Sequence, residues 1–366
     1  MLPSPASSPS LPPALDSVPS RRSSASRTAP ARRRVLTAGA ALGLSALLAA
    51  CGGSGSGAGD GADGAKGGAW SFTDDRGKKL RADSAPQRIV AFTGTAAALA
   101  DFGLADRVVG VFGETKLKNG SAHPQAGDLD VGKVEVLGNA WGEFDIEKYA
   151  ALNPDLLVTH QYDKSSLWYV PEESADKILK VAPSAAVNVA NVPLTEPIER
   201  YAELAESLGA DLDSKKVTEG KARFEKASET LRKAAKKAGG LKVMAASGSA
   251  DYFYVSTPGP AADLTYFEEL GVEFVKPADT KESGGYFESL SWENADKYDA
   301  DLILLDNRST ALQPKDLTAK PTWKELPAVK AGQVAEWDPV PRFSYQGSAP
   351  LLEQLAKAIT DAEKLD

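Results

Sequence analysis

Aromatic and arginine side chains recur just beyond the short apolar runs of this chain. Aromatic rings suit the walls of a site for a large amphipathic ligand, and arginine can donate hydrogen bonds to the oxygens of such a ligand. Only 7% of the residues are aromatic, so their concentration near these positions favours a ligand-binding cleft. The candidate ligand-binding residues are Trp141, Tyr162, Tyr252, Tyr254, Tyr286, Arg308, Arg342 and Tyr345.

Several neighbouring residues allow a structural role as well as a functional one. Trp168 and Phe253 suit a protein core as well as a binding wall. The chain has two histidines, His123 and His160, with no pattern that joins them. Bare zinc or manganese needs several His, Asp or Glu ligands in one site. We therefore predict no protein-built metal site and expect His160 to be a polar loop residue.

The apolar runs alternate with helical patterns, which predicts an α/β fold with mainly parallel sheets. In such sheets ligands bind beyond the carboxyl ends of the strands, where the candidate residues follow their strands. A hairpin is predicted at the start of the folded part, where residues 70–73 and 79–80 flank a turn. The predicted strands are 88–92, 108–111, 156–159 and 185–189, then 242–246, 272–275, 302–305 and 334–337.

An internal repeat indicates two similar lobes with a ligand cleft between them. Residues 147–158 and 293–304 each begin with a glutamate, Glu147 and Glu293, and continue through a short helix into an apolar strand. We expect the lobes at 70–211 and 240–366.

A long helix is predicted between the lobes, at residues 212–239. The stretch 213–238 has no proline and one glycine, and it is rich in Lys, Glu and Ala. It would be roughly 38 Å long at ~1.5 Å per residue. Such a helix is either a stiff strut that limits closure of the lobes or a solvated helix without a special role.

The first 50 residues have the features of a signal peptide. Six arginines at 21–34 precede a 16-residue apolar run, which is shorter than the ~20 residues that span a bilayer. The sequence Leu-Ala-Ala-Cys then ends at Cys51, the only cysteine, which predicts attachment of lipid to its thiol. An ordinary signal with an incidental cysteine is the alternative, and export by the Sec or the twin-arginine route stays open. Residues 51–69 are predicted to be a flexible tether.

Composition excludes several classes of function. From Cys51 onward the chain has 36 basic and 49 acidic residues, a net charge of −13, which disfavours binding to nucleic acid. A single cysteine leaves no disulfide within the chain. No Gly-x-Ser-x-Gly elbow and no Gly-x4-Gly-Lys-Ser/Thr phosphate loop is present, so we expect a binding protein and not an enzyme or an ATPase.

Taken together, the predicted lobes, the connecting helix, the Cys51 motif and the Asn-Pro-Asp-Leu-Leu-Val segment at 153–158 resemble one family. It is the helical-backbone class of ABC-transporter substrate-binding proteins, which carry ferric siderophores, haem and vitamin B12. The segments 73–90 and 326–334 are similar to its siderophore branch. The resemblance implies a monomer, lipid-anchored on the extracytoplasmic face of the cell membrane, that delivers its ligand to a permease and its ATPase. It also implies that Glu147 and Glu293 dock on arginines of the permease.

The residues favour one ligand class within that family. A few arginines among many aromatic residues suit a ferric hydroxamate better than a strongly anionic triscatecholate. The siderophore would then supply every iron ligand, and no separate cofactor is expected. Haem and vitamin B12 stay open as ligands, and so does a surface lipoprotein that senses a ligand without transporting it.

Overall fold

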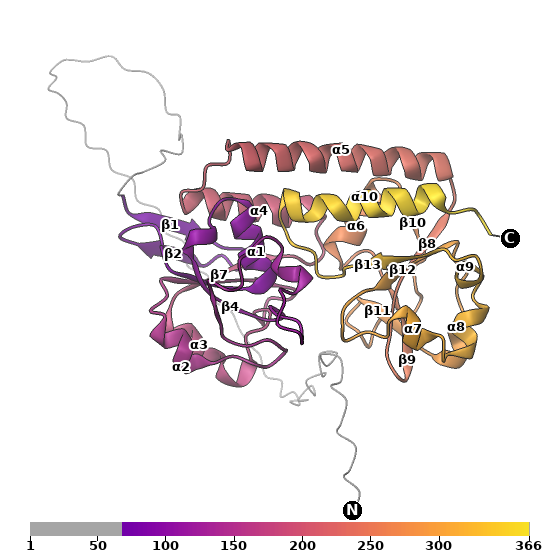
Figure 1. Ribbon diagram of the computed structural model, residues 1–366, viewed down its shortest axis with the longest axis horizontal. Helices are drawn as coiled ribbons and strands as arrows, with labels where there is room; N and C mark the ends of the chain where they lie inside the picture. Colours follow the sequence, from indigo (N-terminus) through magenta and orange to yellow (C-terminus); the bar gives the residue numbers. More distant parts are fainter. Residues whose placement is uncertain (1–67, 366) are drawn as a thin grey trace, which may run out of the picture. The chain divides into compact units, whose positions relative to one another are not determined.

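The computed structural model describes residues 68–365, which belong to one compact unit. The predicted signal peptide, Cys51 and nearly all of the predicted tether lie outside these residues. Within them, no helix combines the length and the apolar character needed to cross a bilayer. Two sheets, each built by one half of the chain, define an N-terminal and a C-terminal lobe (Figure 1).

The N-terminal lobe opens with the predicted hairpin, in which β1 (Trp70–Thr73) pairs antiparallel with β2 (Lys79–Ala82). Its main sheet has the order β5-β4-β3-β6-β7, and every pair is parallel. The strands are β3 (Ile89–Phe92), β4 (Val108–Phe112), β5 (Glu135–Val136), β6 (Leu156–Gln161) and β7 (Ser184–Asn188). The helices are α1 (Thr93–Asp101), α2 (Ile146–Ala151), α3 (Ala175–Val181) and α4 (Thr195–Ser207), with 3-10 turns η1 (Ala105–Arg107), η2 (Pro124–Ala126) and η3 (Glu172–Ser174).

The C-terminal sheet is mixed. Its order is β11-β9-β8-β12-β13, with the short β10 also paired to β8. The pairs among β8, β10, β12 and β13 are parallel, whereas β9 pairs antiparallel with both β8 and β11. The strands are β8 (Lys242–Gly248), β9 (Tyr252–Ser256), β10 (Glu273–Phe274), β11 (Phe287–Ser291), β12 (Leu302–Asp306) and β13 (Val334–Trp337).

The helices of the C-terminal half are mostly short. They are α6 (Ala262–Glu269), η4 (Trp292–Asn294), α7 (Pro314–Leu317), α8 (Pro321–Glu325), α9 (Pro327–Lys330) and α10 (Tyr345–Asp361). All eight predicted strands are present, with ends shifted by up to two residues. The internal repeat is less regular than predicted, because its first copy forms helix α2 and its second only the single turn η4.

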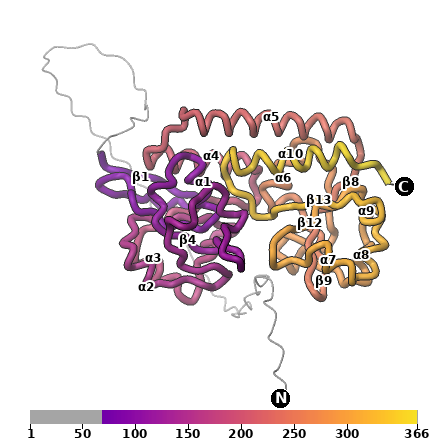
Figure 2. Tube along the Cα trace, in the orientation of Figure 1, coloured from indigo at the N-terminus to yellow at the C-terminus, as the bar shows by residue number. Residues whose placement is uncertain are grey.

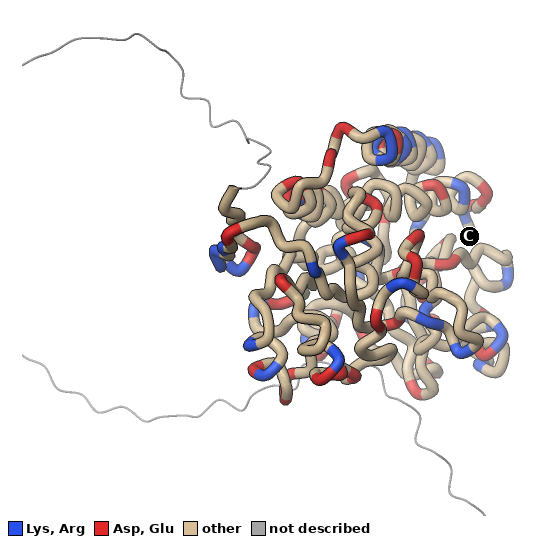
Figure 3. The backbone as a smooth tube through the Cα atoms, turned by 60° about the vertical axis from the view of Figure 1, so that its left-hand side comes forward, with Lys and Arg blue, Asp and Glu red and all other residues tan. Residues whose placement is uncertain are grey.

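Helix α5 (Lys215–Ala238) confirms the predicted long helix. Phe224, Ala227 and Leu231 are buried on its inner face. Nine Lys or Arg and three Glu cover the rest of the helix, whose basic residues are conspicuous at the top of Figure 3. An apolar stripe with a charged opposite face is typical of a helix packed on one side only.

Helix α5 joins the lobes as predicted, and a second helix packs against it. Helix α10 lies beside α5 along its length (Figures 1 and 2). Arg223 of α5 donates two hydrogen bonds, of 2.8 and 2.7 Å, to the carboxylate of Glu353 on α10. No local pattern in the sequence predicts this pairing, because α10 follows the last strand as an ordinary amphipathic helix.

Residues 338–344 carry the chain from the C-terminal sheet to the start of α10, where it contacts the N-terminal lobe. The Ser344 hydroxyl donates to Asp101 at the end of α1, with an Oγ–Oδ2 distance of 2.6 Å, and accepts from the Gly347 amide. Gln346 donates to Asp128 at 2.7 Å. The start of α10 is thus fixed to the N-terminal lobe.

The largest apolar core runs through both lobes. It includes Leu99 of α1, Val243 of β8, Phe224 of α5 and Leu352 of α10. Two smaller cores lie on the other faces of the sheets, one in each lobe. A shared core explains why the described residues form one unit, since separating the lobes would expose apolar surface that both bury.

Candidate ligand-binding site

Six rings form an aromatic cluster at the carboxyl edge of the N-terminal sheet. Trp168 is central, with ring centroids 4.6 Å from Tyr162, 5.1 Å from Trp141 and 5.4 Å from Tyr169. The edge-to-face geometry of these pairs is the arrangement that aromatic rings prefer. The cluster comprises Phe92, Trp141, His160, Tyr162, Trp168 and Tyr169.

Local hydrogen bonds hold the segment 162–169 against the sheet. The Trp168 amide donates to the carbonyl of His160, and the Thr159 hydroxyl donates to the carbonyl of Trp168, both at 2.9 Å. The backbone of Tyr169 has a φ of 61°, which is uncommon for a bulky residue. This turn places the Tyr169 ring 5.1 Å from that of Phe92, with both side chains in the core of the lobe.

The C-terminal lobe meets the cluster through Tyr286. Its hydroxyl donates to the carbonyl of Tyr162 across a distance of 3.3 Å, and the two rings are 6.4 Å apart. Burial raises the pKa of Tyr286 to about 12, so the phenol is a neutral donor at neutral pH. Burial also raises the pKa of Tyr162. Two predicted ligand-binding tyrosines, one from each lobe, are therefore brought together.

Arg308 is held in place by a carboxylate that the sequence analysis did not single out. Its guanidinium donates from Nε at 3.0 Å and from Nη2 at 2.6 Å to the fully buried Asp306, the last residue of β12. Asp306 also accepts from the Ser247 hydroxyl at 2.9 Å. The Arg308 side chain keeps a third of its surface exposed, so it can still contact a ligand. The sequence signal that could have identified this pair is an aspartate at a strand end, two residues before an arginine.

Two further aspartates lie in the same part of the C-terminal lobe. Asp263, at the start of α6, accepts from the Trp337 indole at 2.7 Å. Burial raises the pKa of Asp263 to about 6. Burial, and next the nearby Asp263, raise the pKa of Asp338 to about 6. With Asp306 opposite Arg308, this part of the lobe carries no excess of positive charge.

His160 does not lie in a loop, which corrects the prediction. It is in β6, paired with Val187 of β7, and only 1% of its surface is exposed. Burial lowers the pKa of its imidazole to about 3, so the ring is neutral above pH 4. Within residues 68–365 no group of three or more His, Cys, Asp or Glu side chains is arranged to hold a metal ion.

Tyr252 and Tyr254 form a separate patch on β9. Their rings are 6.2 Å apart, and Tyr254 lies 5.0 Å from Phe287 of β11. Tyr252 is 47% exposed, as is typical of a side chain on the outer part of a sheet. Phe253, between them, is fully buried and packs on Trp292. The pair shares a face as predicted, and its role in binding stays a prediction.

Arg342 and Tyr345 lie where the chain returns to the N-terminal lobe. The Arg342 guanidinium covers Gly127, where a Cβ would be 1.7 Å from Nη1. Gly127 has a φ of 53°, so glycine is required there for both conformation and space. The Tyr345 ring packs 5.8 Å from Phe224 of α5 and 6.2 Å from Phe102. These contacts give both residues a structural role, and ligand binding by them stays a prediction.

The two glutamates that begin the repeat copies are exposed. Glu147 lies in the first turn of α2, behind an Asp145 cap that accepts from the Lys148 amide. Glu293 lies in η4, directly after β11. Hydrogen bonds from its own amide and then from Ser291 lower the pKa of Glu293, which keeps it ionised. Each element connects the carboxyl edge of its sheet to a later strand, so both carboxylates are near the edges that carry the candidate site.

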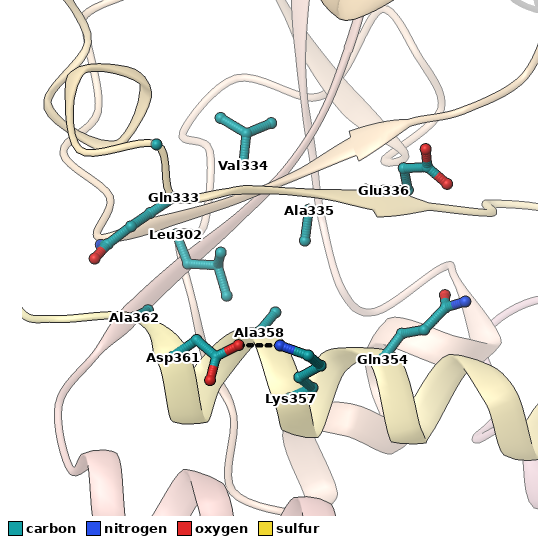
Figure 4. A pocket seen from close by; sticks show the side chains of 11 residues that line it. Leu302, Gln333, Val334, Ala335, Glu336, Gln354, Lys357, Ala358, Asp361 and Ala362 are labelled. Carbon is teal, nitrogen blue, oxygen red and sulfur yellow. Dashed lines mark hydrogen bonds and ion pairs between the residues drawn. The ribbon is translucent and has the colours of Figure 1, made fainter.

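A hollow of about 370 Å³ lies elsewhere, between β13 and α10 (Figure 4). Its lining includes Gln333, Glu336, Gln354 and an ion pair between Lys357 and Asp361. These side chains come from the C-terminal half alone, and the aromatic cluster contributes none of them. We therefore place the candidate site at the meeting of Tyr162, Tyr286 and Arg308.

Two lobes with aromatic and polar groups at their carboxyl edges define a binding protein of the two-lobed class. The sequence profile of the family described as periplasmic binding protein matches residues 89–341. The chain belongs to this family. Because it is a family of binding proteins, the expectation of a binding protein and not an enzyme is confirmed.

Solved structures extend the comparison. The chain is 54% identical to DesE, a ferric-siderophore receptor protein from Streptomyces coelicolor, over 81% of this chain and 100% of that one, with a TM-score of 0.78. FeuA from Bacillus subtilis, a triscatecholate siderophore-binding protein, is 20% identical with a TM-score of 0.58, over 79% and 98% of the two chains, and shows the shared fold.

Among curated proteins, the iron(3+)-hydroxamate-binding protein FhuD of Bacillus subtilis is 25% identical over 57% of this chain and 63% of its own length. The Fe(3+)-citrate-binding protein YfmC of the same organism is 22% identical over 54% and 57%. The chain thus spans about three fifths of the length of these curated relatives.

Proposed function

We propose that this protein is the substrate-binding component of an ABC transporter and captures a ferric siderophore, of the hydroxamate type, for iron uptake. The observation that carries the proposal is the contact of the aromatic cluster with Tyr286 of the other lobe, with Arg308 close enough to Tyr162 to oppose the rise that burial causes in its pKa. The similarity to DesE, a ferric-siderophore receptor protein, supports a ferric siderophore as the ligand. Iron enters as cargo inside the siderophore, so no resident metal is needed.

Charge supports a hydroxamate over a catecholate. Three hydroxamates neutralise one Fe³⁺, whereas three catecholates leave the complex with three negative charges. The positive charge of Arg308 is offset by Asp306, and Asp338 adds a further acid nearby. A site of this kind disfavours a trianion, because like charges at short distance repel. Aromatic walls can instead bury the hydrocarbon parts of a neutral chelate.

Titration followed by tryptophan fluorescence tests the proposal. The panel is a ferric trihydroxamate (ferrioxamine B), a ferric triscatecholate, ferric citrate, haem and cobalamin. Trp141 and Trp168 are in the cluster, so a bound chelate should quench their emission. We expect tight, saturable binding of the trihydroxamate. Preference for haem or cobalamin would reassign the ligand, and no response to any iron chelate would refute the proposal.

Delivery to a permease is part of the same proposal. Glu147 and Glu293 are exposed carboxylates near the same edges of the two sheets, and arginine can receive a carboxylate through two parallel hydrogen bonds. A Glu147→Ala/Glu293→Ala double variant should bind the chelate normally and fail to support iron uptake. A control with Glu172→Ala and Glu353→Ala should transport normally. Normal uptake by the first variant would favour a sensing role over transport.

We also propose that lipid on Cys51 holds the protein on the extracytoplasmic face of the cell membrane. The thiol follows Leu-Ala-Ala and precedes a Gly-rich stretch. The diacyl anchor of a lipoprotein is sufficient for stable attachment, whereas a single acyl chain is marginal. Cell fractionation of a Cys51→Ser variant tests this. Its retention in the membrane fraction, at the level of the unaltered protein, would exclude the anchor.

A further inference from the structure

Half of the buried, unpartnered side-chain polar atoms within residues 68–365 lie in one short segment. Eight such atoms occur, and four of them belong to His160 (Nδ1 and Nε2), Gln161 (Oε1) and Trp168 (Nε1). Buried polar atoms are nearly always hydrogen-bonded, so each exception calls for an explanation. This concentration coincides with the aromatic cluster at the carboxyl edge of β6.

His160 is the most costly of these exceptions. Its neutral ring has one donor and one acceptor nitrogen, and both are buried among aromatic rings without a hydrogen-bond partner. The surrounding rings have centroids 5.1 to 6.0 Å away, and they belong to Phe92, Tyr162, Phe343 and Trp168. A phenylalanine would fill this space without the desolvation cost. Stability alone therefore does not account for histidine here.

The other histidine of the chain provides the contrast. His123 caps the turn η2, where its Nδ1 accepts a hydrogen bond of 3.2 Å from the Gln125 amide. It is only partly buried. One histidine thus has a local structural partner, whereas His160, in the core of the cluster, has none.

The groups near His160 select a particular ligand chemistry. A neutral imidazole and the Trp168 indole each offer an N–H, and their rings are stacked 6.0 Å apart at an angle of 25°. Two neighbouring N–H donors suit an oxygen acceptor, such as the carbonyl-type oxygen of a hydroxamate or an amide. A buried donor that pairs only with ligand gives strong discrimination, because analogues without the acceptor leave it unpaired.

We propose that His160 is a specificity-determining residue, which together with the indole of Trp168 hydrogen-bonds an acceptor oxygen of the bound chelate. This inference rests on the proposed function. Access to His160 requires the Tyr162 ring to move aside. Within the described residues, the hydrogen bond between the C-terminal lobe and Tyr162 is the 3.3 Å bond from the Tyr286 hydroxyl to the Tyr162 carbonyl. A ligand that accepts the hydrogen bond of the Tyr286 hydroxyl in place of the Tyr162 carbonyl releases the segment 162–169 and exposes the His160 imidazole.

Substitution of His160 by phenylalanine separates this role from a structural one. His160→Phe should raise Tm by about 2–4 °C, because it removes two unpaired polar atoms, and should raise the Kd for ferrioxamine B about 10- to 100-fold. His160→Gln, which retains an N–H donor, should bind within about threefold of the unaltered protein. His123→Phe is the matched control and should leave the Kd unchanged. Equal binding by His160→Phe and the unaltered protein would overturn the inference.

A second measurement uses the unaltered protein and does not depend on how the variants fold. The diamagnetic gallium(III) complex of the same trihydroxamate is added to protein labelled with ¹⁵N-histidine. The His160 ring signals should shift on binding while those of His123 stay in place, with His123→Phe giving the assignment. Binding without any change in the His160 signals would overturn the inference. Failure of the unaltered protein to bind any iron chelate would count instead against the proposed function.

Discussion

The carboxyl edges of the two sheets occupy equivalent places in the fold but differ in chemistry. The N-terminal edge is mainly aromatic, with rings packed around Trp168 and a histidine that stays uncharged above pH 4. The C-terminal edge is ionic, with Arg308 bound to Asp306 and two acids whose pKa values are near 6. One topology thus provides two kinds of surface, apolar walls on one side and fixed charge on the other. A neutral, amphipathic chelate suits both.

The ionic edge gives the largest expected effect. Asp306→Asn leaves Arg308 without its carboxylate, and it should lower the free energy of unfolding by about 3–4 kcal/mol. Loss of the negative charge should also improve binding of a ferric triscatecholate relative to the trihydroxamate. Urea unfolding and the ligand panel measure the two effects. The control is Glu353→Gln, since its pair with Arg223 is half-exposed and contributes less than about 1 kcal/mol. Equal free energies of unfolding for Asp306→Asn and Glu353→Gln would show that the Arg308–Asp306 pair stabilises the fold no more than an exposed pair does.

The next largest effect is expected at the aromatic N-terminal edge, on the affinity for the ligand. Trp168→Ala removes the ring that contacts Trp141, His160, Tyr162 and Tyr169, and should raise the Kd for ferrioxamine B about 30- to 100-fold. Tyr252→Ala tests the other candidate surface, the separate patch on β9, and should change the Kd less than about threefold if the site is at Trp168. A larger effect of Tyr252→Ala would move the site to the β9 patch.

The smallest expected effect is on the pH dependence of the free energy of unfolding, which also differs between the two edges. Asp263 has a pKa raised from 3.8 to about 6, so the folded state binds a proton that the unfolded state has already released between these values. The stability gained from the protonated form is complete below about pH 4 and is lost as the pH rises through 6, by on the order of 2 kcal/mol. Denaturant unfolding from pH 4 to 7 of the unaltered protein and of Asp263→Asn measures this loss as the difference between the two profiles.

Asp263→Asn should remove that loss. His160→Phe should remove an opposite dependence, because the pKa of His160 is lowered from 6.5 to about 3 in the folded state and its contribution to stability therefore rises with pH between these values. An unchanged slope in Asp263→Asn would mean that another group, such as Asp338, is responsible.

Local sequence patterns predicted most of the elements. Alternation of apolar runs with helical stretches located eight of the strands, and the Lys-, Glu- and Ala-rich stretch predicted α5 to within three residues. These signals are local, because strand burial and helix amphipathicity are periodic in the sequence. The position of Tyr162 and Arg308 directly after buried strands was also sufficient to predict that each lies at the carboxyl edge of its own sheet.

Partners distant in sequence were not predictable. The pairing of α10 with α5 joins residues 130 positions apart, and Ser344 contacts Asp101 across 243 positions. Nothing near Arg342 in the sequence shows that its guanidinium covers Gly127. The sequence alone also placed His160 in a loop, since a polar pair after an apolar run usually ends a strand.

The sequence by itself thus determined the strands, the long helix and the residues at the strand ends, because these follow from periodicity and from steric preferences over a few residues. The tertiary structure decided which of those residues act together. It placed the rings around Trp168, matched Arg308 with Asp306 and joined the lobes through a shared core. The physical reason is that burial, hydrogen bonding and pKa depend on all neighbours in space, and most of those neighbours come from other parts of the chain.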